Sequence, residues 1–272
     1  MKKIKLSKIS AMHYVKLIKR MALLVLGVVL YVVGYKANAD ATFGGLAGYK
    51  WYMVLVGVIL FVETAMRLYP LPIESMGARK HMKKYYKPTT KDAVPDLPTW
   101  KQTFAIAAAW TALNGVFALL YYTGVIDAGV LVLISVAYSI CDMICILWFC
   151  PFQAWFLKNR CCASCRIYNW DFFMMATPLI FVPHPFAGVL VLLSIAVLVC
   201  WEVSYHRHPK RFSARTNACL SCGACQEKLC QHKKHLHYFW KTNKNRVKDR
   251  DYVRKESAAQ KSKEQEDVEI FK

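Results

Sequence analysis

No histidine lies in the middle of a long apolar run of this sequence; the eight histidines fall in loops, tails or the ends of apolar runs. A b-type haem held between membrane helices takes buried histidine ligands, so this absence argues against such a haem. The chain also has no C-x-x-C-H haem-attachment motif and no Walker or dinucleotide-binding glycine motif. Covalently attached haem, P-loop nucleotides and Rossmann-type dinucleotides are therefore not expected.

Acidic residues are scarce, because 17 Asp and Glu stand against 37 Lys and Arg, for a formal net charge of +20. The chain is nevertheless 56% hydrophobic, whereas soluble domains are about 45–50% apolar. A chain is both strongly apolar and strongly basic only if the two kinds of residue are segregated along it. This pattern predicts an all-α polytopic membrane protein, with the lipid bilayer as its main partner and with basic loops.

Six apolar segments approach the length of roughly 20 residues that a membrane-spanning helix needs. They are Met21–Tyr35, Trp51–Tyr69, Gln102–Tyr122, Ala128–Cys150, Ile167–Val182 and Phe186–Tyr205. The last two form a short hairpin, because Pro183 and Pro185 interrupt any helix between them. The fifth segment is short and contains Pro178, so a re-entrant segment is an alternative to a crossing.

The apolar and polar segments divide the chain into eight parts. These are a basic N-terminus (1–20), a first helix pair (21–69), a basic loop (70–101), a second helix pair (102–150), a cysteine loop (151–166), the short hairpin (167–205), a Cys/His segment (206–240) and a charged tail (241–272).

Lys and Arg set the expected orientation. On a six-span topology, 35 of the 37 basic residues fall on one side of the membrane. The positive-inside rule makes that side the cytoplasm, so we expect both termini to be cytoplasmic in a cytoplasmic (inner) membrane. Lys36-Ala-Asn-Ala-Asp40 also resembles a signal-peptidase site. Cleavage there would leave five spans with the same orientation, although the long basic lead favours a retained helix.

All eleven cysteines lie at or after Cys141, in segments that face or approach the cytoplasm. Disulfides are disfavoured in that reducing compartment. Crowded cytoplasmic thiols more often bind metal or carry out redox chemistry. The topology therefore predicts a cysteine-rich cytoplasmic loop and a cysteine-rich cytoplasmic tail.

The tail contains the densest group of thiols, with the sequence CLSCGACQEKLC, in which the cysteines are Cys219, Cys222, Cys225 and Cys230. The two C-x2-C steps resemble the ligand run of bacterial-type ferredoxins, which implies a 4Fe-4S iron–sulfur cluster. The run departs from that pattern at Cys230, which comes one residue late and has no proline after it. Zinc held by mixed cysteine and histidine ligands is the alternative.

A second group consists of Cys150, Cys161, Cys162 and Cys165 in the loop that precedes the hairpin. The upstream spacing Cys141-x3-Cys145-x4-Cys150-Pro151 resembles the helix-end signature of polyferredoxin-like, membrane-anchored electron-transfer subunits. That resemblance implies iron–sulfur chemistry here also, whereas helix packing explains Cys141 and Cys145 without it. The two groups flank the hairpin, so both should emerge on one face of the membrane.

Few ionisable residues interrupt the apolar segments, and such residues are functional candidates. Asp142 is expected to carry a proton or to pair with Arg160 or Arg166, which follow it in the cysteine loop. Glu63 and Arg67 lie one helical turn apart and are expected to pair with each other.

The favoured hypothesis is a membrane-anchored redox component whose cysteine-ligated clusters relay electrons to a membrane partner or a quinone. Its protein partners would be a soluble ferredoxin or flavodoxin and membrane redox subunits, and nucleic acid is not expected. One alternative is a transport, assembly or sensor protein whose loops are held together by zinc or thiols. Another is a thiol-redox protein that uses Cys162 with Cys165, or Cys222 with Cys225.

Overall fold

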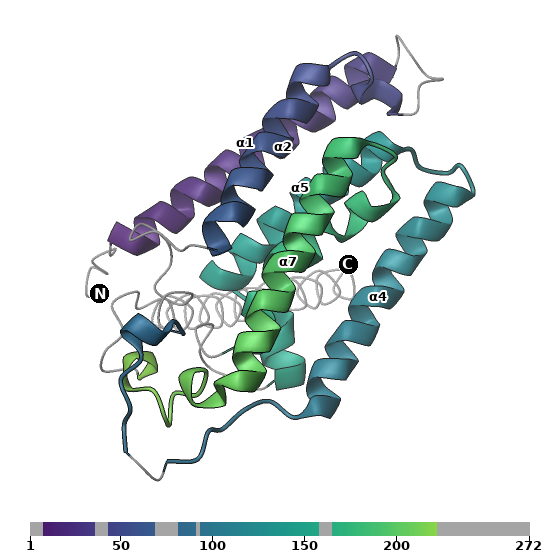
Figure 1. The fold of residues 1–272 in the computed structure, drawn as a ribbon. Coiled ribbons are helices and arrows are strands. Elements are labelled where there is room, and N and C mark those ends of the chain that lie inside the picture. The colour runs from purple at the N-terminus through teal and green to yellow at the C-terminus, as the bar shows by residue number, and fades with distance from the viewer. Residues whose placement is uncertain (1–7, 36–42, 69–80, 91–92, 158–164, 222–272) are drawn as a thin grey trace, which may run out of the picture. The chain divides into compact units, whose positions relative to one another are not determined.

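The structure is a computed structural model that describes residues 8–35, 43–68, 81–90, 93–157 and 165–221 (Figure 1). The chain divides into two compact units, Met1–Leu229 and Cys230–Lys272. All described residues belong to the first unit. Within the described residues the regular elements are helices. Pro88 and Asn217 form an isolated antiparallel bridge.

Five of the described helices are long and apolar enough to cross a membrane. They are α1 (Lys8–Tyr35), α2 (Lys50–Leu68), α4 (Trp100–Tyr122), α5 (Ala128–Leu147) and α7 (Pro185–Arg207). The shorter helices are η1 (Gly44–Leu46), η2 (Lys83–Tyr85), the π-helix η3 (Phe152–Leu157), η5 (Arg166–Asn169), α6 (Asp171–Ala176), η6 (Thr177–Phe181), η7 (Pro209–Arg211) and η8 (Ala218–Leu220). The prediction of an all-α protein with several membrane helices is confirmed at this level.

The bounds of the long helices differ most from the sequence expectation at two places. The first helix begins at Lys8 rather than Met21, so the described part of the basic N-terminus continues the apolar helix without a break. The fourth ends at Leu147 rather than Cys150, with the N–H groups of Trp148 and Phe149 both bonded to the carbonyl of Ile144.

The expected fifth helix is broken into three short pieces, η5, α6 and η6. The break follows from proline, since Pro178 lies at the start of η6, where its missing N–H costs least, and Pro183 prevents continuation. Its longest apolar helical stretch, Asp171–Phe181, falls short of spanning length. The segment is therefore a series of short helical turns held by neighbouring elements, rather than one regular helix.

Helix α5 is the centre around which the others pack. It contacts α1, α6, η1 and η6, and α7 contacts α2, α6 and η6. Half of the most apolar stretch of α5 is buried, against 17% for that of α4. The remaining long helices expose apolar side chains such as Val29, Leu119 and Leu192. A lipid environment explains these exposed faces, because water would disfavour them.

The contacts of α5 also define the two ends of the helix bundle. Near its first residue, Ala128 packs in one cluster with Val182, Leu190 and the side chain of Phe43. Near its last residue, Leu147 packs with Leu17 and with the side chain of Tyr168. We call the second end the Leu147 end. The first half of α1 and the end of α7 belong to it as well, through contacts described below.

Helix α1 and η1 lie in close contact only because the residues at that contact have small side chains or none. A Cβ on Gly45 would lie 1.8 Å from the carbonyl oxygen of Tyr31, a backbone atom that has no freedom to move aside. We predict that Gly45→Ala destabilises the protein by about 1–3 kcal/mol, measured as thermal unfolding in detergent. Gly115→Ala is the control, because nothing lies within 4 Å of its Cβ. An unchanged melting temperature in Gly45→Ala would contradict this close approach.

Candidate site: a buried ionic cluster beside a thiol-lined cavity

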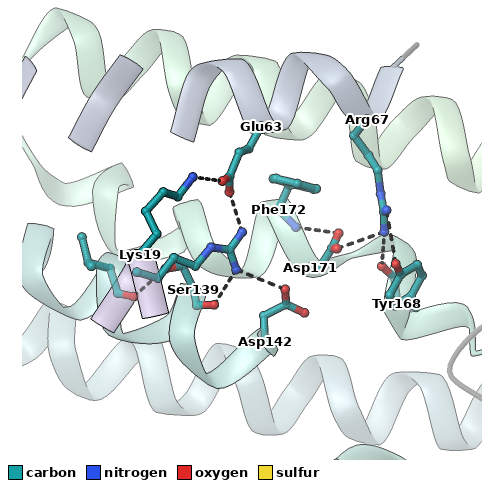
Figure 2. A network of polar contacts seen from close by, with 10 residues as sticks. Lys19, Glu63, Arg67, Ser139, Asp142, Tyr168, Asp171 and Phe172 are labelled. Carbon is teal, nitrogen blue, oxygen red and sulfur yellow. Dashed lines mark hydrogen bonds and ion pairs between the residues drawn. The ribbon is translucent and has the colours of Figure 1, made fainter. Parts of the chain in front are cut away.

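Arg20 lies at the centre of a buried ionic cluster near the Leu147 end. Figure 2 shows the carboxylates of Glu63, Asp142 and Asp171 in this cluster. Its guanidinium contacts the Glu63 carboxylate at 2.5 Å and the Asp142 carboxylate at 3.5 Å. It also donates a hydrogen bond of 2.6 Å to the carbonyl of Ser139. Lys19 completes the group with a contact of 2.7 Å to Glu63. One arginine thus ties α1 to both α2 and α5.

Arg67 forms the second half of the cluster at the end of α2. Its guanidinium donates 3.0 Å hydrogen bonds to the Asp171 carboxylate and to the carbonyl of Tyr168, and it lies 4.5 Å from the centre of the Tyr168 ring. Asp171 also accepts a hydrogen bond of 2.8 Å from the N–H of Phe172. The contacts attach α2 to the junction of η5 and α6, which has little regular helix of its own.

The cluster is balanced in charge. Three cations, Lys19, Arg20 and Arg67, face three carboxylates, Glu63, Asp142 and Asp171. Burying a charge is costly unless it is paired and hydrogen-bonded. Removal of Arg20 or Arg67 would therefore cost more than the loss of one contact, because a carboxylate partner would stay buried without compensation.

The pairing of Glu63 with Arg67 that the sequence predicts is wrong. Glu63 pairs with Lys19 and Arg20 on α1, while Arg67, one turn away on the same helix, pairs with Asp171. Spacing along one helix identifies possible partners on that helix, but it gives no information about partners on other helices.

Asp142 was expected to pair with Arg160 or Arg166. It contacts Arg20, and Arg166 instead forms a pair with Glu202 on α7. Arg160 lies outside the described residues. The proton-carrying role expected for Asp142 stays a prediction.

Beside the ionic cluster lies a cavity of about 90 Å³, which we call the thiol cavity. Four cysteines line it, namely Cys141, Cys145, Cys150 and Cys165. The rest of its wall is mostly apolar, with Trp110, Ile146, Phe152, Ile167, Met174 and Met175 among the lining residues. The cavity thus brings together thiols from α5, from the residues just after it and from the start of η5.

The end of α5 explains why Cys150 lies near Cys145. The N–H of Phe149 bonds to the carbonyl of Ile144 at 3.1 Å, five residues back, so the chain curls at the end of the helix. A bond of this span is one way in which helix ends satisfy their last carbonyls. The curl returns Cys150 toward the last turn of α5, and Cys145 and Cys150 both line the thiol cavity.

A smaller cavity of about 30 Å³ lies on the other side of the two aspartates. Asp142 and Asp171 line both cavities, together with Ile146 and Tyr168. His13 also lines the smaller one, and among the described residues its ring nitrogens have no hydrogen-bond partner. The polar wall and the volume of this smaller cavity suit water. The aspartates therefore separate a polar, arginine-lined cavity from the thiol cavity.

Arg166 fixes the residue next to Cys165 to α7. Its guanidinium donates two hydrogen bonds to Glu202, one of them 3.1 Å long, and lies 4.5 Å from the centre of the Tyr205 ring. The indole of Trp170 donates a 2.6 Å hydrogen bond to the same carboxylate. Bidentate arginine–carboxylate pairs hold a defined geometry. The beginning of η5 is thus anchored to the end of α7.

Cys219 is held by a small folded region that follows α7, in which residues 81–90 pack against residues 208–221. The His81 ring stacks on Phe212 with centroids 4.5 Å apart. The N–H of Ala218 bonds to the carbonyl of Lys87 at 2.8 Å. Asn217 accepts a hydrogen bond of 3.1 Å from the N–H of Cys219. The first cysteine of the tail run therefore has a defined position.

Of the predicted site residues, Asp142, Cys150, Cys165, Arg166 and Cys219 are described. Arg160, Cys161, Cys162, Cys222, Cys225 and Cys230 lie outside the described residues. Within the described residues, no group of three or more His, Cys, Asp or Glu side chains could hold a metal ion. Three of the described cysteines nevertheless lie near the Leu147 end: Cys150 after α5, Cys165 before η5, and Cys219 beyond α7.

Sequence reasoning missed the roles of Arg20, Glu202 and Cys145. Arg20 was counted with the basic N-terminus, although it stands at the start of the apolar run. Glu202 is an acid inside the last apolar segment, which is a signal for function or pairing. Cys145 was assigned to helix packing. No spacing rule places it on one cavity wall with Cys150, because that placement depends on how α5 ends.

Comparison with known proteins adds no assignment. No family model matches the chain, and neither the curated proteins nor the solved structures include a significant match.

We predict that Arg20→Met destabilises the protein by about 3–5 kcal/mol, because Asp142 would then be buried without a cation and Glu63 would lose its closest one. Thermal unfolding in detergent measures the effect. The matched control is the adjacent Lys19→Met, whose side chain is 43% exposed and whose loss should cost about 0–1 kcal/mol. Equal effects of the two substitutions would show that Arg20 does not hold the cluster together.

Proposed function

We propose that this protein is a membrane-anchored redox component that binds a cysteine-ligated iron–sulfur cluster on the cytoplasmic face and relays electrons to a membrane partner or a quinone. The observation that carries the proposal is that the loop group of cysteines ends, and the tail run begins, at anchored positions at one end of the bundle. Cys165 precedes an arginine paired with α7, and Cys219 follows the region that packs on the end of α7.

The two anchor points are connected by a short series of contacts. Arg166 lies over the Tyr205 ring, and that ring packs against Phe212 with centroids 5.2 Å apart. Asn217 donates a hydrogen bond of 2.9 Å to the carbonyl of Arg211, the residue before Phe212. The last cysteine of the loop group and the first cysteine of the tail run therefore lie near the end of α7, which suits chemistry shared between the two groups.

The proposed topology has six crossings. The five long helices supply five of them, and the broken segment of residues 165–182 would supply the sixth. Its Tyr168 packs with Leu147 at one end of α5, and its Val182 packs with Ala128 at the other end. These contacts support a traverse along the full length of α5. The serine hydroxyl of Ser135 donates a 2.8 Å hydrogen bond to the carbonyl of Met175, which helps to satisfy the irregular backbone inside the membrane.

The tail run is the stronger candidate for the cluster. Cys219, Cys222, Cys225 and Cys230 are four thiols within twelve residues, and their C-x2-C steps resemble ferredoxin ligand runs. When bound, a 4Fe-4S cluster supplies one-electron chemistry. The chain's own contribution is the fixed start of the run at Cys219 and the surrounding cations, among them the exposed Lys87 and Lys210. Cations beside thiolates favour the deprotonated, ligating form and would also attract an acidic electron donor such as a ferredoxin or flavodoxin.

Metal and acid-labile sulfide content per chain tests the cofactor. Anaerobically purified protein should contain iron and sulfide and absorb in a broad shoulder near ~400 nm that bleaches on reduction. Cys222→Ser should remove this absorption. Cys200→Ser, in the apolar part of α7, should leave it unchanged. Colourless protein with stoichiometric zinc would refute the iron–sulfur proposal and favour a structural metal site.

Orientation is tested by fusing reporters to the C-terminus. A fluorescent protein that matures only in the cytoplasm should be bright, and an alkaline phosphatase that is active only outside it should be inactive. The physical reason is the concentration of Lys and Arg in the segments assigned to that side. An active phosphatase fusion would reverse the topology and place the cysteines in an oxidising compartment.

A further inference from the structure

A large cavity, which we call the Lys50 cavity, lies between α2, α5, η6 and α7 at the end of the bundle opposite the Leu147 end. Its volume is about 910 Å³, within the range of about 300–1,000 Å³ that is usual for small-molecule sites. Apolar side chains form most of its wall, among them Met53, Val56, Leu60, Val132, Leu179 and Leu190. The Ser135 hydroxyl in this wall is already bonded to the carbonyl of Met175. The cavity therefore suits an apolar chain better than a polar solute.

The length of the cavity matches one leaflet of a bilayer. Along α2 its lining residues extend from Lys50, the first residue of the helix, to Leu60. A helix rises about 1.5 Å per residue, so this stretch covers about 15 Å, which is about half of the hydrocarbon core. On α5 the lining residues Val132 and Ser135 belong to the first half of the helix. The cavity thus follows α2 to about the middle of the membrane.

The ionisable side chains among the described lining residues of this cavity are Lys50 and His184, and both are exposed. The Nδ1 of His184 accepts a hydrogen bond of 3.2 Å from the N–H of Phe186, so a neutral ring carries its proton on Nε2 and donates from there. Lys50 begins α2 and His184 precedes α7, and the N-terminal ends of helices favour anions. The mouth of the cavity therefore offers a cation and a hydrogen-bond donor to an anionic group.

We infer that the Lys50 cavity binds an anionic phospholipid, with one acyl chain along α2 and the phosphate beside Lys50 and His184. The acyl chain matches the apolar wall, and the phosphate accepts from both side chains, as anionic head groups do in basic pockets between membrane helices. The Asp127 carboxylate at this end is not among the described lining residues. It accepts hydrogen bonds from the hydroxyl of Tyr31 and the N–H of Val130.

The lipid site is separate from the cysteine groups. Helix α5 has 20 residues and is therefore about 30 Å long, and the cysteines that line the thiol cavity lie toward its other end. A quinone that takes electrons from the proposed cluster would bind near the Leu147 end. A neutral quinone would also gain less than a phosphate from the charge of Lys50. The inference goes beyond the proposed function and does not rest on it.

Photolabelling of the full-length protein locates the bound chain without any substitution. The protein is reconstituted in phosphatidylcholine vesicles that contain a small fraction of phosphatidylglycerol with a diazirine in one acyl chain, and labelled peptides are mapped. We expect the label to concentrate on residues 50–60 and 179–190. Label spread evenly over the exposed apolar faces, including those of Val29 and Leu119, would overturn the inference.

Competition then identifies the head group. Excess unlabelled phosphatidylglycerol should suppress this labelling, and a photoreactive phosphatidylcholine with the same acyl chain should label these residues much less. Equal labelling by the two lipids would overturn the choice of an anionic head group. Suppression by inorganic phosphate would assign the site to a free anion, and stronger suppression by a long-chain quinone than by phosphatidylglycerol would assign it to a quinone. Either result would overturn the inference.

Variants at the mouth test the two polar contacts. Lys50→Gln should reduce the labelling by phosphatidylglycerol about fivefold, while Lys50→Arg should retain it. His184→Asn and His184→Asp both keep a side-chain acceptor for the N–H of Phe186, but only the second adds a negative charge, so it should label less than the first. Labelling of Lys50→Gln at the level of the unchanged protein would overturn the inference.

A substitution inside the cavity tests the position of the acyl chain. Ala187 lines the cavity and is buried, so Ala187→Leu should fill part of the space and reduce the labelling. The adjacent Gly188→Leu is the matched control, because nothing lies within 4 Å of a Cβ at that position. Unchanged labelling in a folded Ala187→Leu protein would overturn the inference, and if that variant does not fold, Lys50→Gln decides.

Discussion

The pairing of Arg20 with Glu63 and Asp142 is the interaction on which the arrangement of the helices depends. A guanidinium buried in an apolar bundle is tolerated only when carboxylates and carbonyls surround it, and these come from α2 and α5. The requirement fixes which helices meet and at what depth. Arg67 applies the same constraint to α6 through Asp171. Apolar packing alone would allow these helices to slide, since one lipid-facing surface resembles another.

The charged residues of the ionic cluster also determine the position of the candidate site. Because Asp142 and Asp171 are held by arginines on one side, they form a wall of the thiol cavity on the other. A second ion pair, Arg166 with Glu202, holds the start of η5 against α7. Cys165, the last cysteine of the loop, and Cys219, the first cysteine of the tail, thus lie next to anchored positions.

Hydropathy was sufficient to find the regular helices. Four of the expected segments and the last one correspond to α1, α2, α4, α5 and α7, because lipid imposes an uninterrupted apolar length on any spanning helix. Hydropathy did not predict the broken structure of residues 167–182. Its prolines break the hydrogen-bond pattern, and its remaining polar backbone groups are satisfied by neighbours such as Ser135, which no local pattern reveals.

The sequence by itself determined that the protein is a multi-pass helical membrane protein, that its basic residues are segregated and that its thiols fall in the second half of the chain. These properties depend on composition and on distance along the chain, which are local. Only the tertiary structure decided that Glu63 contacts Arg20 rather than Arg67, and that Cys150 lines the same cavity as Cys145. Partners of buried charges and thiols are chosen by proximity in space, and proximity depends on how helices pack and where they end.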